Sequence, residues 1–98
     1  MRNQGEETLI FKNRRSEIEI LDSMLSEANC EVKKTRMLYK ANVCHSQFSD
    51  YFDFLLSQGF ISLARDEPSL KTYVITEKGR YFHSSIRSIL SLTKGSFM

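Results

Sequence analysis

The chain has 98 residues and a mass of 11.4 kDa, which is the size of one domain and excludes a multidomain enzyme. Its 41% hydrophobic and 27% charged residues, with one proline, exclude a wholly disordered or fibrous protein. The net charge is only +2, so the total charge does not by itself indicate a polyanionic ligand. No apolar run reaches the ~20 residues that cross a bilayer, and the N-terminus lacks an apolar signal stretch. We therefore expect a soluble, intracellular protein with no membrane partner.

The two cysteines, Cys30 and Cys44, are too few for a disulfide scaffold. Even with His45 and His83 they lack the clustered spacing of a zinc site. The sequence also has no Gly-rich phosphate loop and no evident nucleophile and base, since Cys44 and His45 are neighbours that diverge on a helix. We expect free thiols, no metal, no cofactor and no enzymatic activity.

The first part of the chain predicts an arm followed by a helix. Residues 1–13 mix charges with a short apolar island and are expected to form a flexible arm or a short edge strand. Ser16 and Glu19 have the spacing of a capping box, in which each side chain bonds the other residue's backbone N–H. This pattern predicts a helix that begins at Glu17 and ends near Asn29.

Two further helices follow at a short interval. Thr35 is a good N-cap for the second helix, and Asn42 tolerates the left-handed conformation that ends one. The third helix is predicted over residues 45–58, before Gly59, by the strongest amphipathic pattern in the chain. Its apolar positions are Phe48, Tyr51, Phe52, Leu55 and Leu56. This spacing favours core packing over base stacking for Phe48, Tyr51 and Phe52.

The period then changes to that of strands. Residues 60–64 and 70–75 are β-rich runs, and the charges and proline of residues 65–69 predict a turn between them. Thr76 can cap a last helix that runs from Glu77 to about Thr93. The predicted order is α-α-α-β-β-α, an α+β fold that is mostly α.

This order is that of a winged helix, a helix-turn-helix followed by a β-hairpin wing. Three segments closely resemble an archaeal winged-helix family: KTRMLYKAN at 34–42, QFSDYFDFLLSQGFI at 47–61 and YVITEKGR at 73–80. The resemblance covers residues 14 to about 90. It implies a DNA-binding, transcription-associated or chromatin protein of the cytoplasm and nucleoid. Members often dimerise through the last helix, as in small archaeal chromatin proteins whose C-terminal helices form an antiparallel coiled coil.

We accordingly divide the chain into the arm, a winged-helix domain over 14–76 and a C-terminal dimerisation helix over 77–98 with a frayed end. Within the last helix, four apolar residues and one threonine recur at near-heptad spacing, and the first helix can cover only part of that stripe. The predicted dimerisation residues are Phe82, Ile86, Ile89, Leu90 and Thr93. The alternative is that this stripe packs entirely within one chain.

The charge of the chain separates into two segments. Residues 30–42 hold four Lys or Arg and one Glu, a local charge of +3, whereas residues 44–58 hold two Asp and no Lys or Arg. We therefore expect the second helix to hold the DNA backbone, and the wing to be a weaker contact. The predicted DNA-contacting residues are Lys33, Lys34, Thr35, Arg36, Lys40, His45, Ser46, Gln47, Ser49, Arg65 and Lys71.

The third helix would enter the major groove of duplex DNA in such a fold. Gln47 could pair with adenine, whereas Asp50 and Asp53 would repel the backbone unless they face away from it. The resemblance sharpens this point, because related sequences carry Lys at several of these positions. Two readings stay open: a winged helix that binds DNA with little sequence preference, and one that binds a protein partner through this helix and not DNA.

Overall fold

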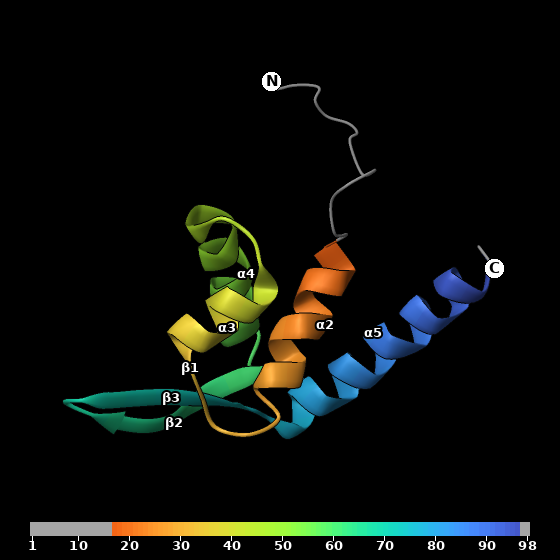
Figure 1. Ribbon diagram of the computed structural model, residues 1–98. Helices are drawn as coiled ribbons and strands as arrows, with labels where there is room; N and C mark the ends of the chain where they lie inside the picture. Colours follow the sequence, from red (N-terminus) through yellow and green to blue (C-terminus); the bar gives the residue numbers. More distant parts are fainter. Residues whose placement is uncertain (1–16, 97–98) are drawn as a thin grey trace.

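The computed structural model describes residues 17–96, and their side chains as far as Leu92. Figure 1 shows α2, α3 and α4 grouped over one side of a small sheet, with α5 extending away beside α2. The elements are α2 (Glu17–Glu27), β1 (Val32–Lys33), α3 (Lys34–Ala41), α4 (His45–Ser57), β2 (Ile61–Glu67), β3 (Leu70–Ile75) and α5 (Glu77–Ser96). This is the predicted winged-helix architecture, and the predicted arm over residues 1–13 lies outside the described residues.

Local sequence signals set most of the helix ends. Asn42 adopts φ 57° and ends α3, and Gly59 adopts φ 78° after α4, so both left-handed stops are confirmed. Thr76 caps α5 as predicted, because its hydroxyl accepts a 2.9 Å hydrogen bond from the Gly79 N–H. Helix α2 begins at the predicted Glu17, although Ser16 of the capping box lies outside the described residues.

The predicted N-cap of α3 is wrong. Lys33 holds the N-cap position, with φ −78° and ψ 149° and no side-chain cap bond, and Thr35 lies inside the first turn. The reason is that Val32 and Lys33 pair with Tyr73 and Thr72 of β3, which keeps the backbone extended as far as Lys33. No local pattern in the sequence predicts this two-residue strand.

The sheet is antiparallel with the order β1-β3-β2. The hairpin is longer than predicted: Arg65, Asp66 and Glu67 belong to β2 and pair with β3, so the turn expected over 65–69 shrinks to Pro68 and Ser69. Charged residues are tolerated in this strand because every residue of β2 after Ile61 is exposed. A register shift between Leu63 and Arg65 marks a β-bulge.

One core joins all the elements. Met24, Leu25, Met37 and Leu55 are fully buried at its centre. The aromatic side of α4 is buried as predicted, since Phe48 and Phe52 are almost inaccessible, and Phe52 meets Tyr73 edge to face at 4.9 Å between ring centroids. These contacts fix α4 against the sheet and leave its polar residues to solvent.

Gly79 brings the start of α5 close to the end of α4. A Cβ atom at this position would collide with the carbonyl oxygen of Phe60, and Ile75 crowds it from the sheet side. Phe60 also stacks on Phe82 of α5, with ring centroids 4.1 Å apart. The N-terminal part of α5 is therefore packed into the domain.

Candidate nucleic-acid interface

The second helix of the motif, α3, turns one face to the core and the other to solvent. Met37 and Ala41 are buried one turn apart, which fixes the rotation of the helix. Four basic side chains therefore lie on the exposed surface. We call them the α3 cation segment: Lys33, Lys34, Arg36 and Lys40.

Few carboxylates balance this segment. The Arg36 Nε lies 3.3 Å from the Glu27 Oε1 of α2, but its side chain is still 59% exposed. The Lys34 ammonium lies 4.5 Å from the centroid of the Phe52 ring, a neutral partner that positions the charge without cancelling it. Among the described residues, no carboxylate pairs with Lys33 or Lys40. The segment keeps most of its positive charge.

Tyr39 is a residue that the sequence reasoning did not select for this surface. It is 77% exposed, although the preceding residue, Leu38, is half-buried. The signal was present, because Tyr39 lies two residues from both Met37 and Ala41 and so points away from the face they bury. Its hydroxyl lies on the same helix as Arg36 and Lys40, where it can donate to an anion.

The first turn of α4 is exposed, as a groove-reading helix requires. His45, Ser46 and Gln47 are all on the surface and Ser49 is half-buried. Cys44 occupies the N-cap position without a side-chain cap bond, and its Sγ lies 3.5 Å from the Ser46 Oγ. The Ser46 hydroxyl first, and the nearby backbone N–H of Gln47 second, lower the pKa of the Cys44 thiol below its ordinary value of 9.0.

The middle of α4 is less favourable to a polyanion. Asp50 and Asp53 are both exposed, one turn apart on the same helix. Burial first, and then the Glu17 carboxylate, raise the pKa of the Tyr51 hydroxyl, while a hydrogen bond with Gln47 acts in the opposite direction. Gln47 therefore lies close to the Tyr51 hydroxyl, one turn away on the same helix.

The hairpin holds its two cations in ion pairs. The Arg65 Nε lies 3.2 Å from the Glu31 Oε1, and the Arg65 Nη1 lies 3.5 Å from the Glu67 Oε2. The Lys71 Nζ lies 4.0 Å from the Asp66 Oδ1. The hairpin and Glu31 together carry more carboxylates than cations.

The predicted dimerisation residues do not share one surface. Ile86 is only 4% exposed and belongs to the core of its own chain, while Phe82 and Leu90 are half-buried against that core. Ile89 is 47% exposed, and the side chain of Thr93 lies outside the described residues. The expectation that Ile86 faces a partner is corrected, because α5 packs on α2 at this point.

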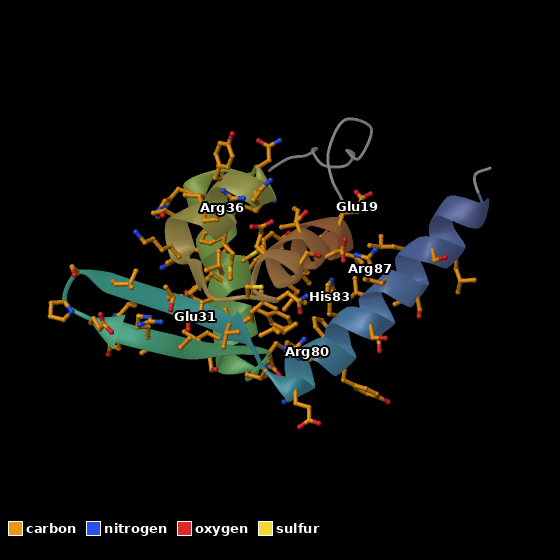
Figure 2. All side chains as sticks on the ribbon, turned by 60° about the horizontal axis from the view of Figure 1, so that its bottom comes forward. Glu19, Glu31, Arg36, Arg80, His83 and Arg87 are labelled. Carbon is orange, nitrogen blue, oxygen red and sulfur yellow. The ribbon has the colours of Figure 1, made fainter. Side chains whose placement is uncertain are left out.

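Polar contacts reinforce that packing. The Asp22 Oδ1 of α2 lies 2.7 Å from the His83 Nε2 and 3.3 Å from the Arg87 Nη1. The Arg80 Nη1 donates to the Asn29 Oδ1 at 2.9 Å. Figure 2 shows Arg80, His83 and Arg87 along α5 on the side toward α2. These residues hold the first half of α5 to the domain.

Other kinds of site find no support in the part of the chain that the structure describes. Within residues 17–96, no three His, Cys, Asp or Glu side chains gather as metal ligands. Both cysteines are exposed free thiols. No described helix is long and apolar enough to span a membrane.

Comparisons with known proteins agree with this architecture. The chain is 32% identical over 80 residues to the protein MJ0287 of Methanocaldococcus jannaschii, which covers 81% of this chain and 77% of that one. The structure of the present chain is similar to that of Sso10a-2, a DNA-binding protein from Sulfolobus solfataricus. The TM-score is 0.75, and the two are 25% identical over 85% of this chain and 86% of that one. SSV1 F-93 has the same fold, with a TM-score of 0.61 and 24% identity over 80% of this chain and 90% of that one.

These similarities confirm the resemblance to archaeal winged-helix proteins that the sequence showed. The family match itself covers residues 14–94 and so includes every described helix and strand except the last two residues of α5. The protein belongs to the winged helix-turn-helix family.

Proposed function

We propose that the protein binds duplex DNA without catalysing a reaction, as a transcription regulator or chromatin-associated protein. The observation that carries the proposal is the α3 cation segment, whose only carboxylate partner among the described residues is Glu27 at Arg36. Cations of this kind hold phosphates and release counterions, which supplies most of the affinity of non-specific binding. The DNA-binding protein Sso10a-2, which shares the fold, supports the same ligand.

The proposed mode of binding places α3 against the backbone and the start of α4 at the groove. Thr35 lies in the first turn of α3, where no side chain caps the helix, so its hydroxyl and the free N–H groups can meet a phosphate. His45, Ser46 and Gln47 would approach the base edges, but the Asp50 and Asp53 carboxylates would weaken a deep insertion. We expect strong salt dependence and little preference for sequence.

The decisive experiment is a fluorescence anisotropy titration of a random-sequence duplex over a salt series. The Lys34→Ala/Arg36→Ala/Lys40→Ala variant should bind about a hundredfold more weakly at ~0.1 M salt, because three phosphate contacts are lost. Each lost contact should also make the slope of log binding constant against log salt concentration shallower by about 0.9. The matched control is Arg65→Gln/Lys71→Gln, which also removes exposed cations but from ion pairs. A DNA affinity that changes neither with salt concentration nor with the α3 substitutions would reject the proposal.

We also propose that the protein acts as a homodimer through the outer side of α5. Ile89 and Leu92 are 47% and 75% exposed and lie three residues apart on this 20-residue helix. Light scattering after size exclusion should give twice the 11.4 kDa chain mass. Ile89→Asp/Leu92→Asp should halve that mass without loss of helical signal, whereas a wild-type monomer at tens of micromolar would contradict the dimer.

The rival function is a protein-interaction module that uses α4. Leu56 is 38% exposed and lies three residues from Asp53, which gives this side of α4 an acidic and apolar surface of the kind that a protein partner can cover. Leu56→Ser separates the two functions. It should leave DNA affinity unchanged if α3 and the start of α4 hold the DNA, and it should abolish partner binding in the rival case.

A further inference from the structure

The base of the hairpin contains a polar cluster that the proposed function does not use. Glu31, in the segment before β1, accepts three hydrogen bonds. The Arg65 Nε and Nη2 donate to its two oxygens at 3.2 and 3.5 Å, and the Thr72 Oγ1 donates at 3.1 Å. Figure 2 shows Glu31 beside the hairpin strands.

The register of the sheet explains why these residues meet. Lys33 of β1 and Arg65 of β2 are both paired with Thr72 of the central strand β3, so the three residues form one row across the sheet. Paired residues of antiparallel strands point to the same face, and so do residues two apart in an extended segment. Glu31 therefore lies on the same face as Lys33, and Arg65 reaches across the buried Thr72 to its carboxylate.

This row is also where the two basic regions of the chain would join. Lys33 is the first member of the α3 cation segment. Arg65 is the hairpin cation that lies in the same row as Lys33. Without Glu31, the positive surface would continue from α3 across the sheet to β2. With it, Arg65 is paired with a carboxylate that also accepts from Thr72, the residue between the two cations in the row.

We infer that Glu31 limits DNA binding by this protein: its carboxylate holds Arg65 against the sheet and confines phosphate contacts to the α3 side. The inference rests on the proposed function. Arg65 is still accessible to phosphate once released, since both side chains of the pair are 45% exposed. The pKa directions agree with a strong mutual contact, because Arg65 lowers the pKa of Glu31 and Glu31 raises that of Arg65.

The test is the anisotropy titration with Glu31→Gln. The glutamine keeps an acceptor oxygen for the Thr72 hydroxyl but no longer holds the guanidinium by charge, which leaves Arg65 with only its 3.5 Å ion pair to the exposed Glu67. One added phosphate contact should tighten binding about five- to tenfold at ~0.1 M salt and steepen the salt slope by about 0.9. The matched control is Glu77→Gln, the same change of charge in the exposed first turn of α5, which should alter affinity less than about twofold.

The double variant Glu31→Gln/Arg65→Gln identifies the responsible cation, because the gain should disappear when Arg65 is absent. A Glu31→Gln protein that binds no tighter than Glu77→Gln, while the wild type binds DNA, overturns the inference and leaves the proposed function intact. A wild type that binds no DNA at low salt overturns both.

A single substitution at Arg65 makes the test independent of the folding of Glu31→Gln. Because Arg65 is already occupied by Glu31, Arg65→Gln in the wild type should change affinity less than about twofold. A loss of fivefold or more would show that Arg65 contacts DNA despite Glu31 and would contradict the inference.

Discussion

The α3 cation segment and the hairpin both present exposed basic residues on the same domain, but they differ in how those charges are paired. Lys33 and Lys40 have no carboxylate partner among the described residues, whereas Arg65 and Lys71 are both in ion pairs. A phosphate can add to the first region directly and must displace a carboxylate in the second. Pairing, more than the number of cations, distinguishes the two surfaces.

The largest effect should come from reversing charge on the unpaired side. Lys33→Glu/Lys40→Glu should weaken DNA binding by more than about a hundredfold at ~0.1 M salt, since two phosphate contacts are lost and two repulsions are added. Arg65→Gln/Lys71→Gln should stay within about threefold of the wild type. Anisotropy titrations of both variants measure the comparison, and equal losses would remove the distinction between the regions.

A smaller gain is expected from the acidic residues of α4. Asp50→Asn/Asp53→Asn should tighten DNA binding about tenfold, because two exposed carboxylates no longer repel the phosphates near the proposed groove helix. The same titration measures it. An unchanged DNA affinity would place α4 away from the duplex and favour the protein-interaction reading.

Tyr39 offers a way to separate charge from hydrogen bonding on α3. Tyr39→Phe should weaken binding about threefold, the typical effect of one neutral hydrogen bond, and leave the salt slope unchanged because no counterion is involved. A salt series on this variant beside Lys40→Ala makes the contrast. A change of slope in Tyr39→Phe would show that the ring positions a neighbouring cation instead.

The smallest expected effect concerns the stability of the hairpin. Hydrogen bonds from Arg65 first and Thr72 second hold the pKa of Glu31 below its ordinary value of 4.5. A depressed folded-state pKa stabilises the protein above the unfolded value, and this contribution is lost as the pH falls through the folded value. Glu31→Gln should therefore melt at a lower temperature than the wild type at pH 7, and the difference should shrink as the pH falls through the folded-state pKa of Glu31. A difference that does not shrink in acid would assign it to packing.

Local patterns in the sequence were sufficient for the helices and the fold class. The spacing of Phe48, Phe52 and Leu55 predicted the buried side of α4, and Asn42 and Gly59 predicted where two helices end. These signals depend on residues within one or two turns of each other, so the sequence carries them without knowledge of the fold. The same local patterns predicted the order of elements and the hairpin, and the family segments made the winged-helix assignment more specific.

Contacts between distant residues decided the rest. Strand β1 exists because Val32 and Lys33 pair with β3, and that pairing moved the start of α3 away from the predicted Thr35 cap. Ile86 is buried because α5 lies along α2, which no pattern within α5 could reveal. The sequence by itself determined which segments are basic, but Glu31 and Arg65 are 34 residues apart, so only the sheet register determined that this cation is already paired.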